Sequence, residues 1–156
     1  MIADWKLERL RRDHPAAPAE PRAMPDEDRR RFRSELLASI GLPGGAGDAE
    51  IALRLSSECR PMVGNAADAE FDLRGCLDHA SLDTRGGLVV WIVDSEDLDS
   101  ASVFSVGFLV RYFDYLWYPS SDDAFIFGVV SGGCLSVDHG GFLRFMSPWG
   151  TPLGRL

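Results

Sequence analysis

The stretch "AFIFGVVSGGCLSVDHGGFLRFM", residues 124–146, decides the fold of this chain because it predicts three strands joined by two tight turns. Apolar, aromatic and β-branched residues dominate Ala124–Val130, Cys134–Val137 and Phe142–Met146, and such residues are enriched in strands. The intervening "SGG" and "DHGG" combine glycine with small polar residues, which is typical of hairpin turns. Because hairpins join neighbouring antiparallel strands, the C-terminal third predicts an antiparallel meander.

Two further apolar segments precede this meander. The run "GLVVWIV" at residues 87–93 is continuously apolar, which predicts a central strand buried on both faces. Residues 103–117 favour a buried amphipathic helix that ends before Pro119, although their aromatic and β-branched content would also suit a strand. The helical interpretation depends on a four-residue spacing shared by Phe104, Phe108, Tyr112 and Leu116.

The N-terminal part of the chain predicts two helices separated by a stiff connector. Residues 3–13 form the first helix, and residues 25–40 form the second, which ends at a Gly-x-Pro sequence. Residues 15–25, "PAAPAEPRAMP", contain four prolines and predict an extended segment without helix or strand. The apolar stripe expected on the first helix consists of Ile2, Trp5 and Leu10.

The middle of the chain gives weaker signals. Residues 50–55 alternate, with Ile51, Leu53 and Leu55 on one side, and this predicts a half-buried strand. Residues 71–73 predict a short strand, and residues 78–87 a turn and loop. The whole order predicts a single α+β domain, residues 1–156, with a mainly antiparallel sheet, two N-terminal helices and one internal helix. Residues 1–24 would be a helix and proline-rich connector leading into the body.

The charge of the chain is acidic and unevenly distributed, with a net value of −8. Residues 1–33 carry nine basic and seven acidic side chains, a net of +2, whereas residues 34–156 carry seven basic and seventeen acidic ones, a net of −10. This excess argues against nucleic acid and against an anionic membrane as partners. It agrees either with solubility alone or with a surface shaped for a basic protein. The basic run at residues 29–33 is interpreted as a solvated helix face.

The three cysteines, Cys59, Cys76 and Cys134, contain no C-x-x-C motif, and we expect reduced thiols that are mostly buried. The first residues lack the apolar core of a signal peptide. No run approaches the ~18 apolar residues of a membrane span. These features predict a cytoplasmic location.

Two Asp-His dipeptides, Asp78-His79 and Asp138-His139, are candidates for chemistry because a carboxylate and an imidazole can bind a divalent metal or exchange protons. However, "DHGG" occupies a predicted turn, where aspartate is favoured for its local backbone hydrogen bonds. We therefore predict no metal and no cofactor, with Asp138 and His139 as the candidate ligands if a metal is bound. The alternative function is a small metal-dependent or cysteine-dependent enzyme.

The run "WYPSSDD", residues 117–123, places two aromatic residues and two adjacent acids before a predicted strand. Aromatic residues are enriched at interface hot spots, and acids speed association with a basic partner. Alternatively, the aromatic residues belong to the core and the acids keep a strand end hydrated. The predicted partner-binding residues are Trp117, Tyr118, Asp122, Asp123, Asp94, Glu96 and Asp97.

The pattern "LWYPSSDDAFIFG…LSVDHGGFLRF", within residues 87–146, resembles small immunity proteins of bacterial polymorphic toxin systems. The resemblance implies a cytoplasmic inhibitor, encoded beside a toxin, that covers the active site of that toxin. The predicted function is therefore stoichiometric binding and neutralisation of a cognate toxin domain, itself basic. No nucleic acid or membrane partner is expected.

Overall fold

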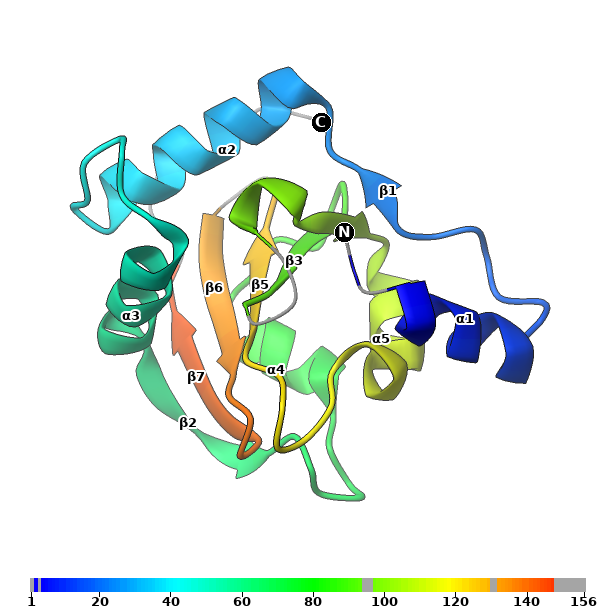
Figure 1. The fold of residues 1–156 in the computed structure, drawn as a ribbon. Helices are drawn as coiled ribbons and strands as arrows, with labels where there is room; N and C mark the ends of the chain where they lie inside the picture. Colours follow the sequence, from blue (N-terminus) through cyan, green and yellow to red (C-terminus); the bar gives the residue numbers. More distant parts are fainter. Residues whose placement is uncertain (1, 3, 94–96, 130–131, 148–156) are drawn as a thin grey trace.

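A seven-stranded sheet organises the protein in the computed structural model, which describes residues 2, 4–93, 97–129 and 132–147 (Figure 1). The strands are β1 (Arg22–Ala23), β2 (Arg60–Asn65), β3 (Leu88–Ile92), β4 (Ser102–Phe104), β5 (Ala124–Gly128), β6 (Gly132–Val137) and β7 (Phe142–Met146). They lie in the order β1-β4-β3-β5-β6-β7-β2, and every neighbouring pair runs antiparallel. Strand β2 therefore forms one edge of the sheet.

The described residues also form five α-helices and one short 3-10 helix, which cover both faces of the sheet (Figure 1). They are α1 (Asp4–Asp13), α2 (Asp26–Ser39), α3 (Asp48–Glu58), α4 (Leu73–His79), α5 (Val106–Leu116) and η1 (Leu98–Ser100). The first core contains side chains of α1, α4 and α5, and the second contains those of α2, α3 and η1. In this part of the chain, no helix has the length and apolar character needed to cross a bilayer.

The alternation of side chains along the central strands separates these two cores. In β3, Leu88, Val90 and Ile92 belong to the first core, whereas Val89 and Trp91 belong to the second. All residues of β3, β5 and β6 are buried. A sheet covered on both faces requires apolar residues at successive positions, which explains the unbroken "GLVVWIV" run. The predicted α+β class with a mainly antiparallel sheet is confirmed.

The predicted meander and the helical interpretation of residues 103–117 are confirmed in their main parts. Strands β5, β6 and β7 are neighbours in chain order. Helix α5 covers Val106–Leu116, and Ser105 caps it by accepting a hydrogen bond from the Phe108 backbone N–H at 3.3 Å. Residues 102–104 form β4 instead of the first turn of this helix.

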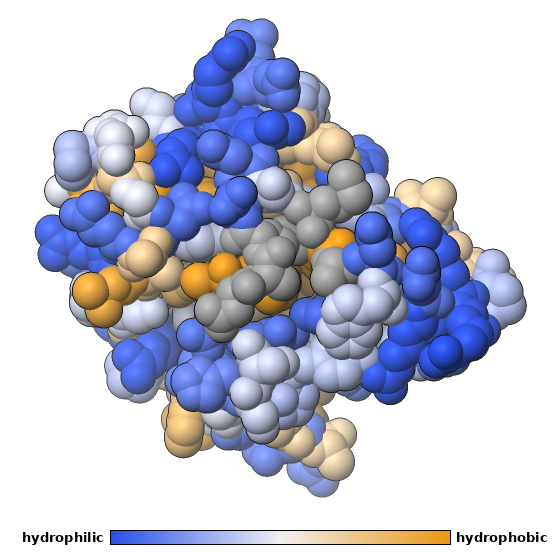
Figure 2. All heavy atoms as spheres, viewed as in Figure 1, coloured by the Kyte–Doolittle hydropathy of each residue, from blue (hydrophilic) through white to orange (hydrophobic). Residues whose placement is uncertain are grey.

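The predicted strand at residues 50–55 is wrong because this segment belongs to α3. Ile51 and Leu55 lie four residues apart, so they share one helix face, and both are fully buried. Leu53, which a strand would place with them, is 74% exposed. Figure 2 shows apolar spots over α3 on an otherwise largely hydrophilic face. Apolar residues at positions i, i+2 and i+4 fit one side of a strand, but the first and last of them also fit one face of a helix. This short pattern therefore does not distinguish the two structures.

The middle segment departs from the prediction in two further ways. Residues 71–73 are not a strand, because Leu73 begins α4, and this helix extends to Asp78 and His79. The described residues therefore form five α-helices, three of them before β2, whereas the sequence predicted two N-terminal helices and one internal helix. Strand β2 was not predicted, because "RPMVGN" contains a proline and a glycine that both weaken a strand signal.

Candidate functional site

The predicted docking segment at residues 117–123 is buried at Trp117 and Asp122, whereas residues 119–121 at its tip are exposed. Trp117 is 2% exposed and Asp122 is 6% exposed. The Trp117 indole Nε1 donates to the Asp122 backbone oxygen at 2.8 Å, and Asp122 Oδ2 accepts from the Tyr118 backbone N–H at 2.7 Å. These bonds close the segment into a compact loop after α5. The expectation that Trp117 and Asp122 form part of an exposed patch is wrong, and the alternative, a core position, holds for Trp117.

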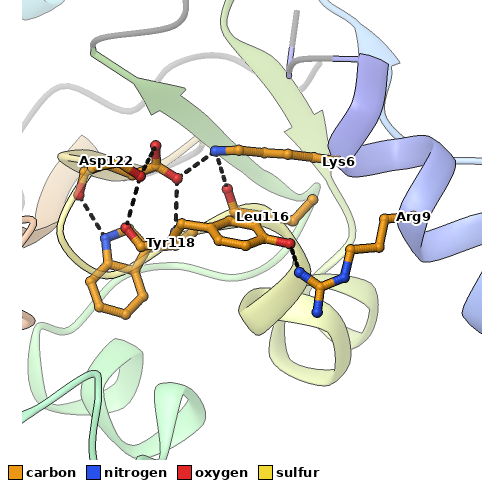
Figure 3. A network of polar contacts seen from close by, with 7 residues as sticks. Lys6, Arg9, Leu116, Tyr118 and Asp122 are labelled. Atoms are coloured by element: carbon orange, nitrogen blue, oxygen red, sulfur yellow. Dashed lines mark hydrogen bonds and ion pairs between the residues drawn. The ribbon is translucent and has the colours of Figure 1, made fainter.

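Lys6 is the one lysine of the chain, and it neutralises Asp122 inside the protein (Figure 3). Its Nζ forms an ion pair with Asp122 Oδ2 and donates to the Leu116 backbone oxygen at 2.9 Å. The two charged side chains are 2% and 9% exposed. Lys6 lies four residues before Leu10 on α1, so the two side chains share one buried helix face. The charge of Asp122 is therefore not available to steer a partner.

A mixed aromatic and cationic rim surrounds this ion pair. The centre of the Trp5 ring lies 5.0 Å from that of the Tyr118 ring. The Arg9 guanidinium donates to the Tyr118 hydroxyl (Figure 3). Trp5 is 52% exposed, so its expected place in the apolar stripe of α1 is wrong. Lys6 and Leu7 occupy that face instead. The rim therefore presents a positive charge from Arg9, where the sequence predicted a negative one.

The second acid of the segment, Asp123, pairs with the hairpin turn between β6 and β7. Its Oδ1 accepts from the His139 backbone N–H at 2.7 Å and lies 3.0 Å from His139 Nδ1. Asp138 Oδ1 accepts from the backbone N–H groups of Gly140 and Phe142 at 2.9 and 3.0 Å. Asp138 therefore closes its own turn, as the turn interpretation requires. Across the described ranges, no three His, Cys, Asp or Glu residues are grouped closely enough to hold a metal ion.

The acidic loop before η1 contributes one described candidate. Asp94 and Glu96 lie outside the described residues. Asp97 is exposed and directly precedes η1, where its backbone oxygen accepts from Ser100 N–H at 2.8 Å. Of the predicted partner-binding acids that the structure describes, Asp97 is the most accessible.

The three cysteines occupy two environments, and all three are free thiols. Cys59 and Cys134 are buried and contact each other, and a hydrogen bond from Cys134 lowers the pKa of Cys59. Burial, followed by the contact with Cys59, raises the pKa of Cys134 well above its ordinary value. Cys76 on α4 is partly buried, and burial together with the Asp72 carboxylate raises the pKa of its thiol. Such shifts keep Cys76 and Cys134 protonated at neutral pH.

A groove of about 550 Å³ opens between α4 and the edge strand β2. Met62 and Phe71 are partly buried in it and pack against the first core, as the buried Leu143 does from β7. Cys76 and His79 line it from α4. The groove therefore combines apolar surface with a thiol and an imidazole.

The strand that forms one side of this groove is irregular. Its pairing with β7 shifts in register between Pro61 and Asn65, and Gly64 has a φ of +112° that side-chain-bearing residues rarely adopt. Val63 is 97% exposed. Asn65 anchors the end of the strand, because its Nδ2 donates to the Gly140 backbone oxygen at 3.0 Å. Asn65 thus holds one end of the strand that lines the groove, and Val63 exposes an apolar side chain beside it.

Three exposed carboxylates, Asp68, Glu70 and Asp72, line the same groove. None of them forms an ion pair with another residue in the part of the chain that the structure describes. The groove lining contains no arginine or lysine among those residues. The groove therefore concentrates negative charge that its described surroundings leave uncompensated.

Sequence reasoning missed this groove because its parts are separated along the chain. The acids at 68, 70 and 72 lie in a stretch without a regular period, and β2 was not predicted. One signal was available in the sequence "DAEFD", where acids occupy every second position. Two of them, Glu70 and Asp72, directly flank the aromatic residue Phe71.

Comparison of the chain with protein-family models, with curated proteins and with solved structures found no match in any of the three.

Proposed function

We propose that this protein is a cytoplasmic immunity protein that neutralises a cognate bacterial toxin by stoichiometric binding at or near the toxin active site. The resemblance of residues 87–146 to such proteins supports the proposal. So does the net charge of −10 over residues 34–156, because it attracts a basic toxin domain, such as a nuclease, and speeds the encounter.

The single observation that carries the proposal is the uncompensated charge of the α4–β2 groove. A specific interface needs apolar area that loses water on contact, and it needs polar groups that match those of the partner. Met62 and Phe71 supply the first requirement. Asp68, Glu70 and Asp72 supply the second, because each is exposed and forms no ion pair with a described residue.

The proposed docking region differs from the segment at residues 117–123. A partner that used Asp122 or Asp123 would have to displace Lys6 or His139 from existing contacts. Displacing a buried lysine leaves an unpaired charge, which costs several kcal/mol. The groove acids require no such displacement. Among the acids predicted from the sequence, Asp97 is the remaining competitor.

The test uses the toxin domain encoded beside the gene and compares two sites of charge reversal. The variants are the double substitution Asp68→Lys/Glu70→Lys and the single substitution Asp97→Lys, each checked for folding by circular dichroism. We expect the parent to form a one-to-one complex and to protect cells that express the toxin. Because rim charges act mainly on association, we expect the groove variant to associate about tenfold more slowly at low salt.

Asp97→Lys is the control at the other candidate site, although it reverses one charge where the groove variant reverses two, and we expect its association rate to stay within about twofold of the parent. Failure of the parent to bind or protect would refute the immunity function. A slower Asp97→Lys variant beside an unchanged groove variant would move the docking site to the loop before η1.

A further inference from the structure

The edge of the sheet at β2 is longer and less protected than the opposite edge. Strand β1 ends the sheet on the other side with two residues, whereas β2 contains six. Natural sheets shield their edges with charges, prolines and bulges. Strand β2 has the exposed Arg60, Pro61 and a register shift, but its residues 62–64 are Met, Val and Gly and carry no charge. No described strand pairs with this edge.

Exposed apolar side chains gather at the same edge. Val63 is 97% exposed, and Phe142 on the adjacent strand β7, paired with Asn65, is 62% exposed. The described residues contain two other large apolar side chains with comparable exposure, Trp5 and Leu53, and both belong to helices. An edge that carries no charge after its first residue, beside exposed apolar residues, is a template for another strand.

The adjoining groove can receive the side chains of such a strand. When an extended segment adds to a sheet edge, its backbone supplies hydrogen bonds, and pockets for alternate side chains supply specificity. Met62 and Phe71 offer apolar surface, and three carboxylates stand around them without a described counter-ion. Alternate side chains of the added segment therefore meet an apolar and acidic surface, which favours apolar and basic residues.

We infer that the toxin contributes an extended basic segment that pairs with β2 as an additional strand and places its side chains in the α4–β2 groove. This inference rests on the proposed function, and it specifies how the partner is held. Pro61 has no backbone N–H to donate, so we place the pairing at residues 62–65. Acids without an ion-pair partner favour binding of a cationic segment. The unpaired backbone groups at the edge of β2 favour an extended conformation of that segment.

The first test uses a fluorescein-labelled ten-residue peptide of alternating lysine and valine, titrated into the full chain and followed by anisotropy. Two derivatives carry N-methyl groups on the lysine amides or on the valine amides. In an added strand only every second N–H faces the sheet edge. One derivative should therefore bind about tenfold more weakly or worse, and the other should bind nearly as the parent peptide does.

Simple charge attraction predicts a different pattern, because both N-methylated peptides keep the same lysine charges. Equal binding of the two derivatives would overturn strand addition, as would the absence of any binding by the parent peptide. A glutamate-valine peptide is the charge control and should not bind. The Asp68→Lys/Glu70→Lys variant should weaken binding of the lysine-valine peptide.

The second test acts on the protein and keeps strand addition separate from immunity. Val63→Pro removes one backbone donor, whereas Val63→Ala removes the same exposed side chain and keeps the donor. We expect Val63→Pro to weaken peptide and toxin binding about tenfold and Val63→Ala less than about threefold, with unchanged circular dichroism. Full toxin binding and protection by a folded Val63→Pro variant would refute strand addition and leave the immunity function intact. Loss of immunity in the parent itself would refute the proposed function.

Discussion

The loop after α5 and the groove between α4 and β2 contain similar residues but differ in where the counter-charge lies. Both combine acids with aromatic side chains. In the loop, Lys6 reaches Asp122 from α1, 116 residues earlier in the chain, and His139 contacts Asp123. In the groove, Asp68, Glu70 and Asp72 have no described ion-pair partner. The difference teaches that acidic residues indicate a binding surface only after their internal partners have been identified.

The largest expected effect comes from removing α1, on which the loop depends. Deletion of residues 1–14 takes Ile2, Leu7 and Leu10 out of the first core and leaves Asp122 without its cation. A proline-rich connector follows this segment, yet its apolar side chains belong to the core of the body. We now expect the deletion variant to lose cooperative unfolding in urea, since each buried aliphatic side chain contributes about 2 kcal/mol. A variant that keeps the parent midpoint would show that α1 adds little to the core.

A single substitution isolates the buried ion pair from the rest of α1. Lys6→Met keeps an apolar chain of similar length and leaves Asp122 buried and unpaired. We expect the free energy of unfolding to fall by about 3–5 kcal/mol. The control Arg9→Met removes an exposed contact to Tyr118 and should cost less than about 1 kcal/mol.

The double variant Lys6→Met/Asp122→Asn tests whether the loss comes from the unpaired charge. The introduced amide is neutral and keeps an acceptor for the Tyr118 backbone N–H, so the double variant should recover part of the stability that Lys6→Met loses. Equal destabilisation by Lys6→Met and Arg9→Met would show that the ion pair contributes no more than a surface contact.

Elements with strong local periodicity could be predicted from the sequence, and elements without it could not. The four-residue spacing from Phe104 to Leu116 predicted α5 correctly, and continuous apolar runs predicted β3 and β5. The segment at residues 50–55 failed because its short alternation is compatible with a helix face at Ile51 and Leu55. Strand β2 failed because neighbours in the sheet, not its own composition, stabilise it.

The candidate site was less predictable because it depends on contacts between distant segments. No local pattern connects Lys6 to Asp122. A partial signal was present, since Ile2, Lys6 and Leu10 recur at four-residue spacing, and a lysine inside an apolar stripe indicates a buried partner. To predict the groove, one must know how β2 pairs with β7 and where α4 packs. A single sequence gives neither of these long-range contacts.

A smaller effect distinguishes the loop after α5 from the α4–β2 groove by the stability of the folded protein, without a binding measurement. Asp123→Ala removes the acceptor for the His139 backbone N–H, and we expect a loss of about 1 kcal/mol in the free energy of unfolding. Asp68→Ala removes an exposed charge from a protein of net charge −8, so we expect a change within about 0.5 kcal/mol. Urea unfolding of both variants at the same ionic strength measures the difference. A larger loss for Asp68→Ala would mean that the groove acid has a structural role.

The smallest expected effect uses the Cys76 thiol as a reporter of the groove charge. Burial and then the Asp72 carboxylate raise the pKa of Cys76, and the thiolate is the form that reacts with iodoacetamide. The alkylation rate of Cys76 in the folded protein should therefore rise at a higher pH than the rate of the same cysteine in the unfolded chain. Cys59 and Cys134 are buried and should react only after unfolding, when all three thiols become reactive.

Asp72→Asn removes the negative charge beside the thiol, which favours the thiolate and lowers the pKa of Cys76. The pH profile of alkylation should shift to lower pH, so the rate at a fixed pH near 8 should increase. Asp78→Asn is the control, because it removes the same charge from α4, the helix that Asp72 directly precedes, without being a cause of the Cys76 shift. Rates read by mass spectrometry between about pH 7 and about pH 10 cover the transition. Equal shifts in both variants would show that the thiol responds to the general charge of α4, whereas a shift confined to Asp72→Asn places an uncompensated carboxylate against the groove wall.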